Sequence, residues 1–197
     1  MKNRRLWSKE YLVAAFILAE VVLVLVSWIL AAMMTEGVHS LLSSEGIRWL
    51  FGSFTSILAS PLLVWLLLGL MAYGSLRQSG LLSVSRSYRD RMALRLAVAV
   101  IVVYVAVLLL LTMLPHAVLL SASGDLFPSA FSRSLVPVVA FGVMLTSDAY
   151  GVMSGRFRSL ADIFDSLASG IRRGAWLLVL YVFLIQFCES LKFVFGS

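Results

Sequence analysis

The chain has 197 residues, of which 61% are hydrophobic and only 13% are charged, and its mean hydropathy is +0.98. These values lie far from those of soluble globular domains, so we do not expect a soluble protein. The net charge is +6 and there is one cysteine, Cys188. The basic residues flank apolar segments, so anionic lipid headgroups rather than nucleic acid account for them. One cysteine allows neither an intramolecular disulfide nor a cysteine cluster for metal, and we expect no cofactor.

Five long apolar runs follow one another along the chain. They occupy residues 11–34, 50–76, 92–114, 134–155 and 175–195. Each run is close to the roughly 20 residues that a helix needs to cross a hydrocarbon core of about 30 Å. The first run is too long for the hydrophobic region of a cleaved signal peptide, which has about 7–15 residues. We therefore predict an all-α integral membrane protein with five transmembrane helices in a single polytopic domain, 1–197.

The loops between the runs differ sharply in charge. Three segments that share one side of the membrane hold 13 of the 16 basic residues. These are Lys2, Arg4, Arg5, Lys9, Arg77, Arg86, Arg89, Arg91, Arg95, Arg156, Arg158, Arg172 and Arg173. Only Arg48, Arg133 and Lys192 fall on the other side. The positive-inside rule then predicts a cytoplasmic N-terminus and an outer C-terminus, in a bacterial cytoplasmic (inner) membrane.

Short-range signals predict details of these helices. Ser43 or its neighbour can cap a short helix with Glu45 in its first turn, and Pro61 is expected to kink the second span. The stretch 156–173 is amphipathic, with Ser159 and Asp162 spaced as a variant capping box. Its apolar positions are Phe157, Leu160, Phe164, Leu167, Ala168 and Ile171. We predict a cytoplasmic interfacial helix at 157–171, with Ser169 on its polar face.

Acidic residues inside apolar runs are the main candidates for function, because an ionisable group in the membrane is costly. Glu20 lies deepest, near the middle of the first span. It is either a proton or cation site, or a carboxyl that fixes helix packing, and the sequence leaves both open. Glu189 lies three residues before Lys192, so we expect an ion pair.

Asp148 follows Thr146 and Ser147 in the fourth span. Their oxygens suit a sodium ion, but they can equally satisfy backbone groups or pair with an arginine, which we favour. Gly151 and Gly155 form a Gly-x-x-x-Gly pair, which predicts a close helix contact within or between protomers. No metal site is expected, because the two histidines stand alone in different loops.

Three sequence motifs, taken in order, are spread over most of the chain. The first is Leu41-Leu42-Ser43-Ser44-Glu45-Gly46-Ile47-Arg48-Trp49, and the second runs from Gly69 to Arg77-Gln78-Ser79-Gly80-Leu81-Leu82. The third combines Ala149-Tyr150-Gly151, Gly155, Ser159, Asp162 and Gln186-Phe187. Together with the basic and then leucine-rich segment 89–114, they resemble the p-aminobenzoyl-glutamate transporter (AbgT) family.

The resemblance implies a transporter-like membrane fold in a shortened form. Family members are longer and carry further spans and a polar hairpin where residues 83–89 join the chain directly here. The family's final spans and second hairpin have no counterpart after Gln186-Phe187. Asp148 replaces a residue that is usually apolar in the family, so no ligand role transfers to it. The helices that remain correspond to the family's scaffold and dimer contact.

Two functions follow as alternatives. The chain is either the oligomerising scaffold of a transport system, associating as a homodimer or with a larger membrane partner, or a compact homodimeric transporter. The transporter would move p-aminobenzoyl-glutamate or a similar anionic solute, coupled to protons or sodium. We expect the scaffold, because five helices of mostly Leu, Val and Ala offer few convergent polar groups. In both cases the protein lies in the lipid bilayer.

Overall fold

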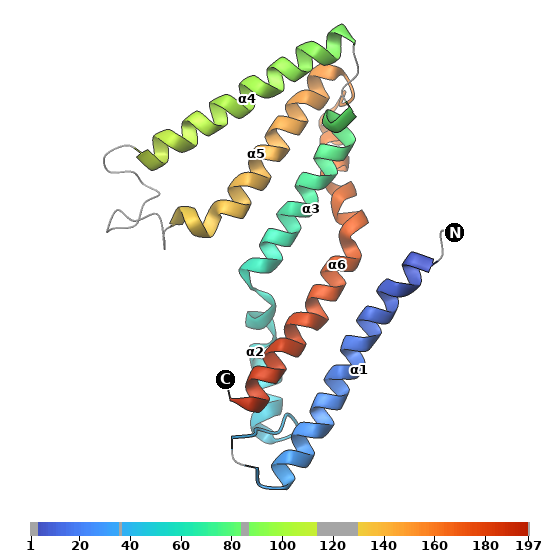
Figure 1. The fold of residues 1–197 in the computed structure, drawn as a ribbon, viewed down its shortest axis with the longest axis vertical. Helices are drawn as coiled ribbons and strands as arrows, with labels where there is room; N and C mark the ends of the chain where they lie inside the picture. The colour runs from blue at the N-terminus through green and yellow to red at the C-terminus, as the bar shows by residue number, and fades with distance from the viewer. Residues whose placement is uncertain (1–3, 36, 84–86, 114–129, 197) are drawn as a thin grey trace. The chain divides into compact units, whose positions relative to one another are not determined.

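The computed structural model describes residues 4–35, 37–83, 87–113 and 130–196, and these form six α-helices and one short 3-10 helix without any strand (Figure 1). The elements are α1 (Arg4–Ala32), α2 (Ser44–Leu58), α3 (Pro61–Ser79), η1 (Leu81–Ser83), α4 (Tyr88–Met113), α5 (Ala130–Ser154) and α6 (Leu160–Phe195). Five segments in the described ranges are long and apolar enough to cross a membrane. The predicted multi-pass, all-α membrane fold is confirmed.

The second span is interrupted at proline. α2 ends at Leu58 and α3 begins at Pro61, because proline lacks the N–H that would continue the helix and suits a first helical position instead. The Tyr181 hydroxyl donates to the Leu58 carbonyl at 3.2 Å and lies 2.5 Å from Ser60 Oγ. The expected kink is therefore a break, and Tyr181 supplies a hydrogen-bond partner for the freed end of α2.

Contacts group the chain into two compact units. Unit 1 contains residues 1–63 and 175–197, and unit 2 contains residues 64–174. Each unit has its own packed contacts. The predicted single domain stays a prediction.

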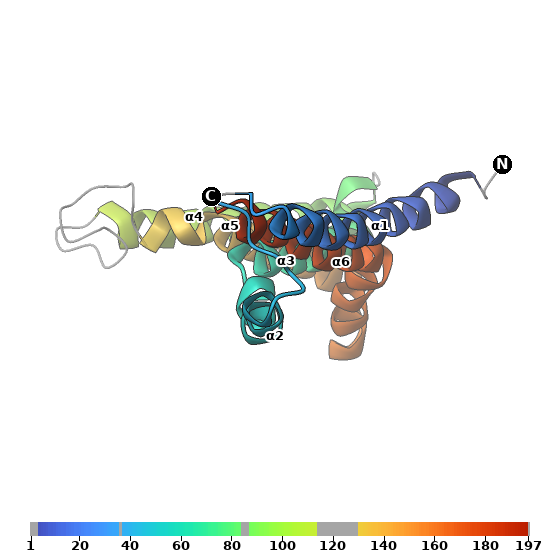
Figure 2. The same ribbon diagram turned by 90° about the horizontal axis from the view of Figure 1, so that it is seen from below.

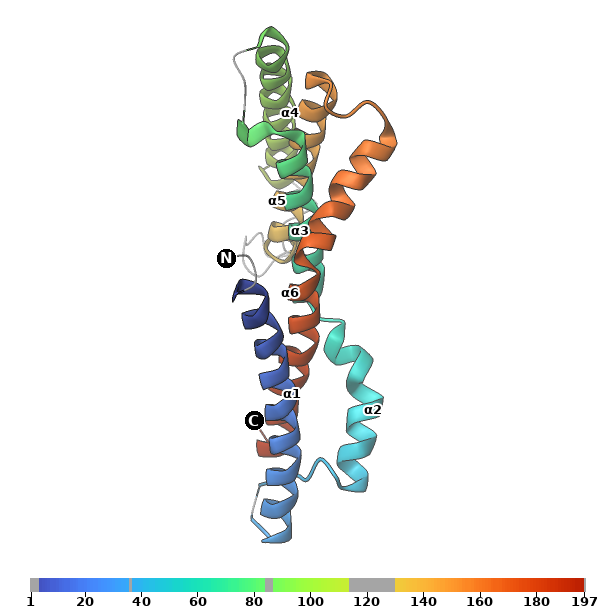
Figure 3. The ribbon, with the colours of Figure 1, turned by 90° about the vertical axis from the view of Figure 1, so that its right-hand side faces the viewer.

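In unit 1, α1 and the C-terminal part of α6 run side by side in the same direction (Figures 1 and 3). Lys9 lies 4.4 Å above the Trp176 ring at one end, and the Phe16 and Phe187 rings meet edge-on at 6.1 Å further along. Near the other end, Val194 packs against Leu23 in a small apolar core. The paired residues advance together along both helices, which fixes the parallel orientation.

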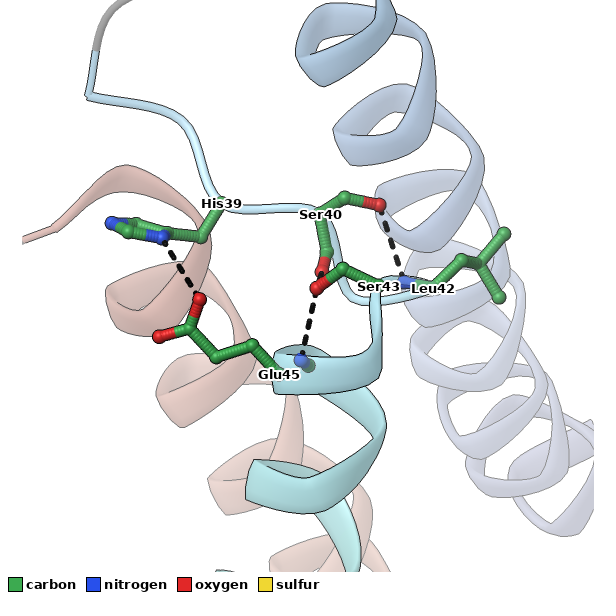
Figure 4. Close-up of polar contacts among 6 residues, drawn as sticks. His39, Ser40, Leu42, Ser43 and Glu45 are labelled. Carbon is green, nitrogen blue, oxygen red and sulfur yellow. Dashed lines mark hydrogen bonds and ion pairs between the residues drawn. The ribbon is translucent and has the colours of Figure 1, made fainter.

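The connection from α1 to α2 is ordered by hydrogen bonds (Figure 4). The Gly46 amide donates to Ser43 Oγ at 3.0 Å, so Ser43 is the N-cap of α2, as predicted. The His39 ring nitrogen lies 3.9 Å from the Glu45 carboxylate. The His39 amide also donates to the Val194 carbonyl at 2.9 Å, which joins this loop to the end of α6.

In unit 2, α4 lies alongside α5 (Figure 2). The Tyr104 hydroxyl of α4 donates to the Val138 carbonyl of α5 at 2.8 Å, and its ring covers Gly142 so closely that a Cβ there would lie 2.8 Å from it. Ala93, Ala97 and Tyr150 form a fully packed cluster between the two helices. Small residues and one tyrosine thus set the spacing of this helix pair.

The segment 157–171 differs from its prediction. It does not form a separate interfacial helix, because α6 begins at Leu160 and continues without interruption to Phe195. Phe157 precedes the helix and is buried against Gly151. Leu160 and Phe164 remain 84% and 72% exposed, so this side of the segment is free for the expected contact with lipid headgroups, which stays a prediction.

Small residues make the buried face of this part of α6 instead. Ser166 is fully buried and Ser169, expected on the polar face, is 6% exposed. The predicted capping box at the helix start is confirmed, because the Ser159 amide donates to Asp162 Oδ2 at 3.0 Å and the Asp162 amide donates to Ser159 Oγ at 3.3 Å. The capping box was therefore predicted correctly, whereas the burial of Ser169 was not.

Candidate functional site

Glu20 turns toward α6 within unit 1. The Ser190 hydroxyl donates to Glu20 Oε1 at 2.6 Å, and the Gln186 amide nitrogen donates to Ser190 Oγ at 3.3 Å. Gln186 and Ser190 are four residues apart and share one face of α6. The three side chains form a polar cluster in otherwise apolar spans, as an intramembrane carboxyl requires.

A cavity of about 500 Å³ adjoins this cluster. It lies between α1, α2 and α6, entirely within unit 1. Its wall consists of Ile17, Glu20, Val21, Val24, Leu50, Phe51, Phe54, Thr55, Phe183 and Gln186. Aliphatic and aromatic side chains dominate, and the polar side chains of the wall are Glu20, Thr55 and Gln186.

Two oxygens of the cluster lack a hydrogen-bond donor. Glu20 Oε2 and Gln186 Oε1 are buried, and no group of the described residues donates to either. A buried acceptor without a donor costs about 1–3 kcal/mol, more for a charged group. The arrangement is therefore incomplete as a helix-packing contact, and it can accept further hydrogen bonds.

Asp148 lies in a second polar contact, inside unit 2. Ser75 Oγ of α3 donates to Asp148 Oδ1 at 2.6 Å. Thr146 instead donates to the Gly142 carbonyl of its own helix at 2.7 Å, while the fully buried Ser147 hydroxyl has no hydrogen-bond partner among the described residues. The three side chains do not converge on one point, because consecutive residues of a helix point in directions about 100° apart.

The Gly151 and Gly155 pair is covered by the chain's own residues. A Cβ on Gly151 would lie 2.4 Å from the Phe157 ring, and one on Gly155 would lie 2.3 Å from Arg89 Nη2. Gly155 has a φ of 79° and ends α5 in the left-handed conformation that glycine adopts freely. A contact of these glycines with a second protomer stays a prediction.

Sequence reasoning did not find the partners of Glu20 and Asp148. Ser75 follows the close-packed Gly74, and Ser190 lies one turn after Gln186, yet neither position differs in pattern from other serines in the spans. The Glu189–Lys192 pair was predicted from spacing and is present at 2.7 Å. Among the described residues, no group of three or more His, Cys, Asp or Glu side chains gathers in a way that suits a metal ion.

The sequence matches the model of the AbgT putative transporter family over residues 82–194. This match spans more than half of the chain. The protein belongs to the AbgT putative transporter family. No curated protein and no solved structure matches the chain.

The AbgT match begins at Leu82 and ends at Val194, so it covers α4, α5 and nearly all of α6. It includes Asp148, Gln186 and Ser190, whereas Glu20 precedes it. The third stretch of the resemblance falls within the match, and the first two lie before it except for Leu82. Family membership and the five spans establish a transporter-like, multi-pass membrane protein.

Proposed function

We propose that this protein is an oligomerising scaffold component of an AbgT-type transport system in the bacterial cytoplasmic membrane. Its N-terminus is cytoplasmic, and it associates as a homodimer or with a larger membrane partner. The observation that carries this proposal is that Asp148 and Glu189, in the spans covered by the family match, already have side-chain partners. Asp148 is held by Ser75, and Glu189 pairs with Lys192.

Other polar side chains in the spans of unit 2 support the same function. Tyr104 donates to a carbonyl of α5, and Thr146 donates to a carbonyl of its own helix. Secondary transporters usually bind solute with polar groups and irregular backbone that face a cavity near the middle of the membrane. Here Tyr104 joins two helices and Thr146 bonds within its own helix, so both hydroxyls already have backbone partners, which suits a structural subunit.

The test is reconstitution of the purified protein alone in liposomes. We expect no uptake of p-aminobenzoyl-glutamate above that of empty liposomes, with or without proton and sodium gradients. Counting labelled subunits in lipid nanodiscs should give two copies for a homodimer. A single copy with no co-purifying membrane partner, or saturable uptake, would contradict the scaffold function.

A second function is favoured by one observation, the cavity beside Glu20 in unit 1. A compact ion-coupled transporter of p-aminobenzoyl-glutamate or a similar anion would need such a space next to an ionisable group. Saturable uptake that requires an ion gradient and is lost in Glu20→Gln would support this function. The same experiment therefore decides between the two.

A further inference from the structure

In the cluster of Glu20, Gln186 and Ser190, two acceptor oxygens receive no hydrogen bond. Gln186 Nε2 gives one hydrogen to Ser190 Oγ, and Ser190 gives its only hydroxyl hydrogen to Glu20 Oε1. Neither residue then has a hydrogen directed at Glu20 Oε2 or Gln186 Oε1, which are both buried. An ionised carboxylate and an amide oxygen can only accept. Each of these two oxygens can therefore still accept a hydrogen.

Among the described residues that line the cavity, no side chain can neutralise an ionised Glu20. From α1 the cavity wall receives Ile17, Val21 and Val24 beside Glu20; from α2 it receives Leu50, Phe51, Phe54 and Thr55; and from α6 it receives Phe183 and Gln186. None of these neighbours is titratable or charged. The charged residues near the end of α6, Glu189 and Lys192, pair with each other at 2.7 Å.

The geometry points to a proton as the missing hydrogen. We propose that Glu20 binds a proton within the membrane, and that the protonated carboxyl donates from Oε2 to Gln186 Oε1. The result is a closed ring in which Gln186 donates to Ser190, Ser190 donates to Glu20, and Glu20 donates to Gln186. On release, the proton leaves for water and the carboxylate keeps the negative charge, while Ser190 and Gln186 retain their own hydrogens.

The surroundings favour a proton over a metal cation. A hard cation needs a shell of several oxygens at short distance, but the wall here is mainly aliphatic and aromatic. An isolated carboxylate in such a medium is strongly disfavoured, whereas its neutral form needs only hydrogen-bond partners. The cavity of about 500 Å³ can hold water, which occupies about 30 Å³ per molecule in the liquid, and the polar groups that a proton-carrying water needs are Glu20, Thr55 and Gln186.

This inference goes beyond the proposed scaffold function and does not depend on it. Protonation of Glu20 removes the negative charge from the contact between α1 and α6 in unit 1, whether or not the protein transports a solute. Failure of the scaffold test would leave the proton site intact. Absence of the proton would leave the oligomeric state and the uptake result unchanged.

Infrared spectroscopy of the full chain in lipid nanodiscs tests the proposal directly. At neutral pH we expect the carbonyl-stretching band of a protonated carboxylic acid, shifted in D₂O because the proton exchanges. Glu20→Gln should remove the intensity of one such group. Matched controls are Glu189→Gln, which makes the same change on α6 outside the cluster, and Asp148→Asn, which removes the other intramembrane carboxyl. Both should retain the Glu20 band.

The proposed ring of hydrogen bonds makes a separate prediction for Gln186, which accepts from Glu20. Gln186→Leu should move the band toward the frequency of a carboxyl without a hydrogen-bond acceptor, and this readout remains if Glu20→Gln does not fold. Absence of the band in the wild type, an unchanged band in Glu20→Gln, or an unshifted band in Gln186→Leu would overturn the proposal. Loss of the band when sodium replaces choline at constant pH would also overturn it, because sodium would then occupy the site.

Discussion

Gly74 of α3 and Gly170 of α6 are in backbone contact within unit 2. A Cβ atom on Gly74 would lie 2.6 Å from the Gly170 nitrogen and 2.4 Å from the Ser166 carbonyl oxygen. A Cβ on Gly170 would lie 1.8 Å from the Leu70 carbonyl oxygen. Backbone atoms on both sides cannot move aside as a flexible side chain can. This contact, rather than apolar side chains, sets the separation of the two helices.

Substitution of these glycines should therefore be costly. We expect Gly74→Ala and Gly170→Ala each to destabilise the protein by about 1–3 kcal/mol, the usual cost of forcing extra volume into a packed contact. Thermal unfolding in detergent, followed by tryptophan fluorescence, measures the change. Gly69→Ala is the matched control on the same helix, because a Cβ there meets no atom within 4 Å. Equal destabilisation by Gly69→Ala and Gly74→Ala would contradict the contact.

The Ser75–Asp148 hydrogen bond makes a second prediction. Asp148→Asn keeps an oxygen that accepts from Ser75, so it should retain most of the stability, whereas Asp148→Leu loses the bond and leaves the Ser75 hydroxyl without its partner. Hydrogen bonds between membrane helices contribute about 0.6 kcal/mol on average and up to about 1.7 kcal/mol. We expect a loss in that range for Asp148→Leu in the same unfolding assay. A Leu variant as stable as the Asn variant would show that Ser75 does not depend on Asp148.

Contacts within a few residues could be predicted from the sequence. Ser43 caps α2, Ser159 and Asp162 form their box, Glu189 pairs with Lys192, and the second span is disturbed at Pro61, where a kink was expected and a break is found. The five spans could also be predicted, since length and hydropathy determine whether a helix can cross the bilayer.

The partners of the buried carboxyls could not be predicted in this way. Ser75 lies 73 residues from Asp148, and Ser190 lies 170 residues from Glu20. Which serine meets which carboxyl depends on how the helices pack. The same is true of the N-terminal part of α6, where Ser169 was expected on a polar face. The short backbone distance at Gly74 admits only small residues there, so the serine and glycine face is buried.

The start of α6 should respond to acid. The backbone amides of Arg158 and Ser159 donate to the Asp162 carboxylate and hold its pKa below the ordinary value of 3.8. The folded state thus binds this proton more weakly than the unfolded chain, so the cap contributes fully at neutral pH and is lost as the pH falls below the ordinary value. We expect the hydrogen-exchange protection factors at 159–163, taken relative to the intrinsic exchange rate at each pH, to be equal at pH 7 and pH 5 and to fall only in stronger acid. Asp162→Ala should show low protection throughout, and wild-type protection that already falls between pH 7 and pH 5 would exclude this cause.

The orientation in the membrane follows from charge and from the parallel helices of unit 1. Because α1 and the end of α6 run in the same direction, the N-terminus and the C-terminus lie on opposite sides if each helix crosses once. The 13-to-3 distribution of basic residues then predicts a cytoplasmic N-terminus. A reporter that is active only in the cytoplasm should be active when inserted within 83–88 and inactive when fused after Ser197. A reporter active only outside, fused at the same two positions, is the control and should give the reverse result. Cytoplasmic activity after Ser197 together with none at 83–88 would reverse the orientation, and cytoplasmic activity at both positions would contradict five crossings.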